Sequence, residues 1–234
     1  MEPSIDTLEL GPRERLALHG RAALSDADLI AVLLGTGLQS LPVGVLAGRI
    51  LADAGGLHGL ARLPLSQLEA QTGIGLTKAC RLLAAFELGA RGQAQPFERK
   101  RPLTSSRDVA AALRPRFLHE VREHFLAIAL DAKNRPLAEL TVAVGGLASC
   151  AITPADVFRP VLQAAAVGVI FVHNHPSGDP APSEADVAVT ERLCRAGEVL
   201  GISVFDHVVL GEPDYFSFAD AGWLARITTP VSTP

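Results

Sequence analysis

The sequence has little cysteine and no long hydrophobic run. Cys80, Cys150 and Cys194 are far apart and odd in number, so they predict neither a disulfide framework nor a zinc finger. We expect them to be small buried residues of a cytoplasmic protein. No apolar stretch approaches the roughly 20 residues that a membrane span needs, and the acidic, polar start does not resemble a signal peptide.

The sequence also lacks an excess of basic residues. It has 21 Lys and Arg residues against 25 Asp and Glu residues, which gives a formal net charge of −4. This balance argues against a protein whose whole surface grips nucleic acid, because tight phosphate binding needs clustered Lys and Arg. A local contact is not excluded. With 48% hydrophobic residues, the 234-residue chain can bury a sizeable core in one large or two small domains.

Residues 1–91 predict a small all-α domain made of several short helices. Ser25 and Asp28 have the spacing of a capping box, an apolar run follows, and Gly35 marks a helix end. A second helix is expected over residues 43–51. Ser66 and Glu69 again have capping-box spacing.

Residues 68–79 look like a helix-hairpin-helix. Glycines at the positions of Gly73 and Gly75 let the chain turn tightly, and amide groups at the start of the second helix can face a phosphate. Lys78 would add positive charge. Helical hairpins often serve only to pack against the rest of a domain. In addition, residues 1–91 are nearly neutral, with eight basic and nine acidic residues. Contact with DNA or RNA through Gly73, Gly75 and Lys78, and simple packing, both remain open.

Residues 92–102 predict a linker, since they are polar and bounded by Gly92 and Pro102. The cluster Arg99-Lys100-Arg101 could touch nucleic acid or be a solvated hinge.

From residue 103 to residue 227 strands alternate with helices, which predicts an α/β (α+β) domain. Strands are expected over residues 125–130, 136–144, 167–173 and 202–210, with the first two forming a hairpin. Helices are expected over residues 105–113, 153–166, 183–200 and 216–225. Residues 228–234, with two prolines and no apolar periodicity, predict a loose tail.

The stretch over residues 173–186 is the most informative one for function. His173 and His175 end an apolar strand, and alternate residues of a strand point to the same face. A turn rich in proline and glycine follows, and Asp186 lies in the first turn of the next helix. Two imidazoles and one carboxylate are a normal set of protein ligands for a catalytic zinc ion, whose fourth position is left to water.

A simpler interpretation exists for each of these residues. Ser183 and Asp186 also fit a capping box, and a pair of histidines two apart occurs by chance. The combination of both histidines at the end of a strand with a serine and an aspartate opening a helix favours a Zn²⁺ site held by His173, His175 and Asp186.

The motif His173-x-His175, seven residues, Ser183-x-x-Asp186 resembles the JAMM signature of MPN-type metalloproteases. The string over residues 173–178, together with Asp206-His207, is similar to the bacterial RadC family, and residues 12–16, 23–26 and 33–37 resemble its amino-terminal region. The resemblance covers nearly all of the chain. It implies a mixed-sheet, MPN/JAMM-like catalytic domain preceded by a small helix-hairpin-helix-like domain.

The resemblance also assigns roles to residues outside the ligand set. Glu123, just before the strand at 125–130, corresponds to the family's general acid–base, although Glu120 is a neighbour that the sequence does not exclude. Ser183 carries over as a donor to the developing oxyanion. His207 could orient a ligand or be an ordinary strand histidine. One departure is visible, because Ala155-Asp156 stands where the family commonly has Arg-Glu.

The sequence therefore predicts a zinc hydrolase that cleaves an amide or isopeptide bond in a peptide or protein. Two alternatives remain open. One is a DNA-associated repair or recombination accessory protein that uses its helical domain to contact DNA. The other is a non-catalytic scaffold that keeps the zinc site for folding or peptide capture.

Overall fold

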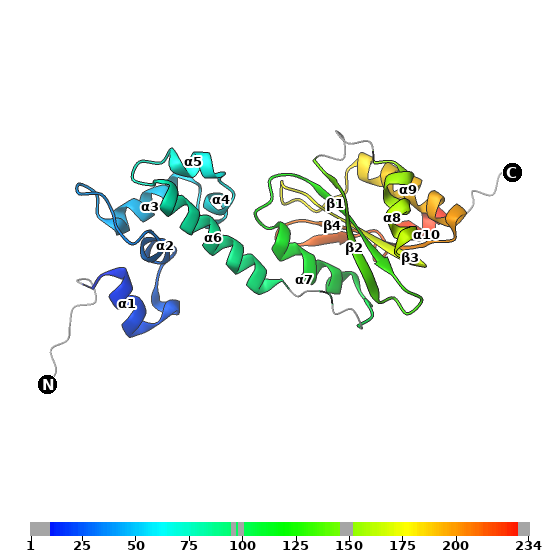
Figure 1. Ribbon diagram of the computed structural model, residues 1–234, viewed down its shortest axis with the longest axis horizontal. Helices are drawn as coiled ribbons and strands as arrows, with labels where there is room; N and C mark the ends of the chain where they lie inside the picture. Colours follow the sequence, from blue (N-terminus) through cyan, green and yellow to red (C-terminus); the bar gives the residue numbers. More distant parts are fainter. Residues whose placement is uncertain (1–9, 95–96, 98–100, 146–151, 229–234) are drawn as a thin grey trace. The chain divides into compact units, whose positions relative to one another are not determined.

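The structure is a computed structural model that describes residues 10–94, 97, 101–145 and 152–228. The chain divides into two compact units, residues 1–92 and 93–234 (Figure 1). Four sequence predictions fall outside the described residues: the acidic start, the basic residues Arg99 and Lys100, Cys150, and the tail over residues 229–234.

The described part of the first unit is helical. Its elements are α1 (Pro12–His19), the 3-10 helix η1 (Arg21–Ala23), α2 (Asp26–Leu34), α3 (Val43–Asp53), α4 (Leu57–Ala61), α5 (Leu65–Glu69) and α6 (Leu76–Gln93). The expected capping box of Ser25 and Asp28 begins α2, and Gly35 ends it with a φ of 77°. Apolar side chains of these helices bury one common core, which includes Ile30, Leu46, Leu60, Leu68 and Leu82.

The turn between α5 and α6 is tight. Gly73 has a φ of +87°, a conformation that glycine adopts without steric strain. The Lys78 Nζ donates a hydrogen bond to the carbonyl oxygen of Gly73 at 3.0 Å. The predicted capping box of Ser66 and Glu69 is wrong, because α5 begins at Leu65 with Pro64 as its N-cap, and Pro64 has no side-chain cap.

The second unit holds a five-stranded mixed sheet. Its strands are β1 (His124–Leu130), β2 (Pro136–Val144), β3 (Gly168–Asn174), β4 (Ser203–Leu210) and β5 (Tyr215–Ser217). Its helices are α7 (Ser106–Phe117), α8 (Pro154–Gln163), α9 (Glu184–Leu200) and α10 (Trp223–Thr228). The strand order is β2-β1-β3-β4-β5; β3 and β4 are parallel and the other neighbours are antiparallel. The described residues thus confirm an α+β fold.

The two faces of this sheet bury separate cores. One core contains Phe125 and Phe171 with apolar residues of α8 and α9. The other contains Leu126 and Ile170 with apolar residues of α7. Helices therefore cover both faces of the sheet (Figure 1). Because successive strand residues alternate between the faces, neighbours in the sequence enter different cores.

Two expectations for this part of the chain are corrected. The helix expected over residues 216–225 is wrong, because residues 215–217 form β5 and pair with β4, and α10 begins only at Trp223. Tyr215 and Ser217, two residues apart as the period of a strand requires, pair with Leu210 and Val208. Cys80 is exposed rather than buried, whereas Cys194 is buried as expected.

The remaining elements agree with the sequence to within a few residues. The hairpin of β1 and β2 is confirmed, and Thr153 and Asp156 form a capping box at the start of α8. Among the described residues, no helix has both the length and the apolar character that crossing a membrane requires.

Candidate metal centre

The centre forms where β3 ends. Every residue of β3 is buried, and the strand carries His173 and Asn174 at its carboxyl end. His175 follows, and its backbone N–H donates to the carbonyl oxygen of Leu210 on β4 at 2.8 Å. This bond extends the sheet past the strand, so the two imidazoles two residues apart emerge on the same face.

His173, His175 and Asp186 converge on one point. The two Nε2 atoms are 2.9 Å apart. The His173 Nε2 lies 3.2 Å from Asp186 Oδ1, and the His175 Nε2 lies 3.4 Å from Asp186 Oδ2. Within the described residues, this is the one group of three or more His, Cys, Asp or Glu side chains arranged to hold a metal ion.

The chemistry of this set fits a metal ion. Four ligands placed tetrahedrally about 2.0–2.1 Å from zinc are about 3.3 Å apart, close to the distances between these nitrogen and oxygen atoms. The side chains of His173 and Asp186 are 0% and 1% exposed, and that of His175 is 13% exposed. The group is therefore closed on two sides and opens to solvent beside His175.

Asp186 sits at the start of α9. Its Oδ2 accepts hydrogen bonds from the Ser183 backbone N–H at 2.7 Å and from the Ser183 Oγ at 2.6 Å, and its own N–H donates to the Ser183 Oγ. The capping box is thus present and uses the same carboxylate as the metal group. The capping role of Ser183 and Asp186 is therefore compatible with a metal-binding role for the same carboxylate.

The pKa values follow from this arrangement. Burial is the main influence that lowers the pKa of His173, although Asp186 acts against it. The hydrogen bond with Asp186 raises the pKa of His175. Burial opposes ionisation of Asp186, but its bonds with His173 and His175 outweigh burial and hold its pKa well below the usual range. At neutral pH the Asp186 carboxylate is thus ionised. It faces the imidazoles of His173 and His175, which can either share a proton with it or bind a metal ion together with it.

Glu123 lies directly before β1 and acts on this group. Its negative charge is a minor influence that favours the protonated forms of His173 and His175, whereas burial still lowers the pKa of His173 overall. The buried Asn174 side chain fixes the backbone on either side of it: Asn174 Oδ1 accepts from the His124 N–H at 2.8 Å, and Asn174 Nδ2 donates to the Arg122 carbonyl oxygen at 3.1 Å. Glu120 instead contacts His124, with its Oε2 at 3.1 Å from His124 Nε2.

His207 on β4 is fully buried and contacts His173 at Nδ1, the ring nitrogen that does not face His175 and Asp186. Its Nε2 lies 2.8 Å from His173 Nδ1, and its Nδ1 lies 2.5 Å from the Thr190 Oγ1. Neither Thr190 nor Asn174 was selected from the sequence. Thr190 follows Asp186 by four residues on α9, which places both on one side of the helix, and that spacing was the available signal.

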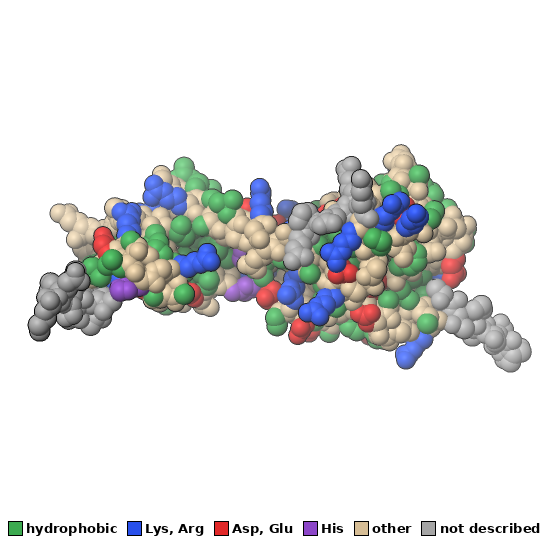
Figure 2. Space-filling model, turned by 90° about the horizontal axis from the view of Figure 1, so that it is seen from below, with side chains coloured by type: hydrophobic (Ala, Val, Ile, Leu, Met, Phe, Trp, Pro, Cys, Tyr) green, Lys and Arg blue, Asp and Glu red, His purple; other side chains and the backbone are tan. Residues whose placement is uncertain are grey.

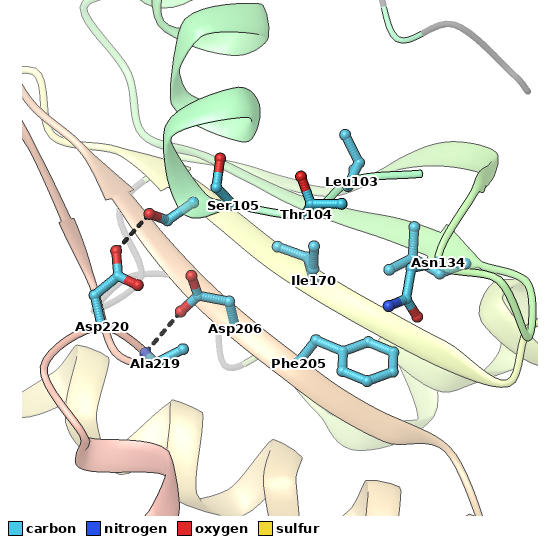
Figure 3. A pocket seen from close by; sticks show the side chains of 11 residues that line it. Leu103, Thr104, Ser105, Asn134, Ile170, Phe205, Asp206, Ala219 and Asp220 are labelled. Carbon is cyan, nitrogen blue, oxygen red and sulfur yellow. Dashed lines mark hydrogen bonds between the residues drawn. The ribbon is translucent and has the colours of Figure 1, made fainter. Parts of the chain in front are cut away.

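A second polar cluster lies on the opposite face of β4. It lines a hollow of about 360 Å³ near the start of α7 (Figure 3). Asp206 accepts hydrogen bonds from the Ser217 Oγ and from the N–H groups of His207 and Ala219. Asp220 accepts one from the Ser106 Oγ. These carboxylates are bonded to hydroxyl and amide donors of their own chain, which is the pattern of a structural network.

Comparisons with known proteins agree with this architecture. The sequence model of the RadC-like JAB domain matches residues 103–223, and that of the UPF0758 N-terminal region matches residues 8–80. A "UPF0758 protein" of Desulforudis audaxviator is 43% identical over 209 residues, which are 89% of this chain and 91% of that protein. Proteins with the same name from Rubrobacter xylanophilus (43%; 92% and 95% covered) and Methanococcoides burtonii (41%; 92% and 93% covered) are similarly related.

Proposed function

The chain belongs to the family of RadC-like JAB-domain proteins, and on this basis we propose that it is a zinc-dependent hydrolase cleaving an amide or isopeptide bond in a peptide or protein. The observation that supports the proposal best is the convergence of His173, His175 and Asp186 beside the charge of Glu123. An imidazole and carboxylate set with one open side matches catalytic zinc sites.

Each residue of the centre has a separate role in the proposed reaction. Zinc held by the three ligands would supply a water of pKa about 7 and polarise a substrate carbonyl. Glu123 takes a proton from the attacking water and delivers one to the leaving amine, which typically contributes a factor of about 10²–10⁴. The Ser183 hydroxyl, which donates to Asp186, reaches a developing oxyanion only by giving up that bond. Substrate enters from the His175 side, where the group meets solvent.

A cleavage screen tests this function. Zinc-loaded protein is offered peptides, isopeptide-linked peptides and nucleic acids, beside the variants Glu123→Gln and Glu120→Gln. We expect amide cleavage that falls about 10²–10⁴-fold in Glu123→Gln and stays near the original rate in Glu120→Gln. Equal rates for Glu123→Gln and the unaltered protein would point to the non-catalytic scaffold, and cleavage of nucleic acid alone would reject an amidase.

We also propose a local contact with nucleic acid through Gly73, Gly75 and Lys78. The tight hairpin turn supports it, because a helix start approached through glycines leaves its amides near the surface. On the face shown in Figure 2, the Lys and Arg side chains of the first unit stand apart rather than in one patch. A contact on this face would therefore involve few basic side chains.

Binding to duplex and single-stranded DNA at several salt concentrations tests this second proposal. We expect an affinity that weakens as salt rises and that drops in Lys78→Gln. The exposed Lys133 lies in the turn after β1, so Lys133→Gln serves as a charge-matched control and should bind as before. Absence of binding at low salt would leave packing as the role of the hairpin.

A further inference from the structure

A buried chain of hydrogen bonds connects one metal ligand to another through the protein interior. Thr190 and His207 are both 0% exposed. The Thr190 Oγ1 lies 2.5 Å from the carbonyl oxygen of Asp186, and His207 bridges Thr190 to the Nδ1 of His173. These hydrogen bonds thus connect the backbone of Asp186 on α9, through His207 on β4, to His173 on β3.

The direction of each of these hydrogen bonds follows from the carbonyl oxygen of Asp186, where the series begins. A carbonyl oxygen can only accept, so the Thr190 hydroxyl donates to Asp186. With its one proton used, the Thr190 oxygen accepts from His207, which therefore carries a proton on Nδ1. The opposite direction would leave two oxygen lone pairs facing each other at 2.5 Å.

His207 is held in its neutral form by its surroundings. The rings of Phe125, Phe171 and Phe218 lie against it, with centroids 5.4, 6.2 and 5.1 Å away. Burial among such groups disfavours a charged imidazole. A neutral His207 protonated on Nδ1 has a lone pair on Nε2, and this atom faces the Nδ1 of His173 at 2.8 Å.

We propose that Thr190 and His207 are positioning residues that hold His173 as the tautomer protonated on Nδ1, with its Nε2 lone pair directed at the metal centre. This inference rests on the proposed metal site. His175 reaches the same state more simply, because its Nδ1 lies 2.7 Å from the carbonyl oxygen of Asp179, an obligatory acceptor. Both imidazoles therefore present the nitrogen that a metal requires.

Thr190→Val removes the hydroxyl and keeps the shape of the side chain. The His207 Nδ1 then loses its acceptor, and His207 gains by moving its proton to Nε2 and donating to His173. That change places a proton on the His173 Nε2, where the metal must bind. We expect zinc affinity to fall about 10–100-fold, the usual effect of losing a partner behind a metal ligand.

Two further variants separate this role from a general effect on folding. Thr190→Ser keeps the hydroxyl and should bind zinc within about threefold of the original affinity. Ser217→Ala removes another buried hydroxyl, which donates to Asp206 on the other face of β4. Ser217→Ala should lower the melting temperature and leave zinc affinity unchanged.

The experiment measures zinc affinity by competition with a chromophoric chelator for the full chain and these three variants. Loss in Thr190→Val alone supports the inference. Equal affinity of Thr190→Val and the original chain overturns it while the metal site stands. If the original chain binds no zinc, the proposed function itself fails.

A measurement on the unaltered protein keeps the inference testable even if Thr190→Val does not fold. Nitrogen-15 NMR of the imidazoles distinguishes a protonated ring nitrogen from one with a lone pair. We expect His207 to carry its proton on Nδ1, and a coupling across the hydrogen bond from His173 Nδ1 to His207 Nε2. A proton on the His207 Nε2 overturns the assignment.

Discussion

Two neighbouring residues of β4, Asp206 and His207, enter polar clusters that differ in kind. Both are buried, and the alternation of the strand sends them to opposite faces of the sheet. Asp206 meets a hydroxyl and two amide donors, so every partner supplies what the carboxylate needs. His207 contacts His173, which meets His175 and Asp186 at a point where only a proton or a metal ion can balance the acceptors.

The comparison shows that burial of polar groups does not by itself indicate a functional site. A cluster whose donors and acceptors match is stable alone and fixes the fold. A cluster with more hydrogen-bond acceptors than donors requires a cation. Such a cluster in a packed core therefore indicates a site that binds one. By this criterion the hollow lined by Asp206 and Asp220 is structural, and the group at the end of β3 is the candidate metal centre.

The largest difference between the two clusters is expected when one carboxylate on each face is neutralised. Asp186→Asn removes one of three ligands and should weaken zinc binding by more than about 100-fold, beyond the effect of losing a partner behind a ligand. In Asp206→Asn the side-chain amide N–H would face groups that are themselves hydrogen-bond donors. We therefore expect a loss of about 1–3 kcal/mol in the free energy of unfolding. Its zinc affinity should stay unchanged.

Zinc titration and thermal unfolding of both variants check this prediction. Zinc binding that is lost equally in Asp186→Asn and Asp206→Asn would mean that the two clusters are not separate.

A second change tests the part of the centre that does not bind metal. Asn174→Ala removes both bonds that hold the backbone around Glu123. We expect the cleavage rate to fall about 10–100-fold, less than in Glu123→Gln, because a misplaced base keeps part of its effect. Zinc affinity should change little, as Asn174 is not a ligand. Parallel rate and affinity measurements on one preparation check this, and a large loss of affinity would contradict it.

The pH dependence of zinc binding should also depend on the group at the end of β3 and not on Asp206. The pKa of His175 is raised in the metal-free chain, so below that pKa zinc must displace a proton from it. Zinc affinity should therefore rise about tenfold per pH unit as pH increases toward this pKa, and level off above it. Asp206→Asn should follow the same curve. Affinity that is flat from pH 5 to pH 8 in the unaltered chain would contradict the protonation state assigned to His175.

The smallest expected effect concerns the helix caps. Ser183 and Thr153 cap α9 and α8 with the same box, but only the Ser183 box shares its carboxylate with the metal group. Thr153→Ala should lower the free energy of unfolding by about 1 kcal/mol and leave zinc affinity unchanged. Ser183→Ala should show a similar loss of stability together with weaker zinc binding. Calorimetry with zinc titration checks both, and identical behaviour would remove the special role of Ser183.

The sequence could predict the elements of the centre because the signals are local. Two histidines at strand spacing and an aspartate at a helix start define three candidate ligand positions once β3 and α9 are recognised. Local signals also predicted the hairpin of β1 and β2. They failed for β5, because three residues that pair only with β4 cannot be told from the start of a helix.

The partners behind the ligands could not be predicted, because they depend on how the elements pack. Thr190 contacts His207 only because α9 lies on β4, and Asn174 reaches Arg122 and His124 only because β3 pairs with β1. Pairs separated by 17 and 52 residues leave no periodic trace in one sequence. The same limit applied to the choice between Glu120 and Glu123, for which the comparison of Glu123→Gln with Glu120→Gln is the test.

If His173, His175 and Asp186 jointly hold one metal ion, X-ray absorption at the zinc edge of the zinc-loaded full chain will identify the ligand atoms. The account predicts one zinc per chain with two imidazole nitrogens and oxygen neighbours at about 2.0–2.2 Å in four-coordinate geometry. Zinc surrounded by sulfur or by oxygen alone, or a chain that retains no zinc, would contradict it.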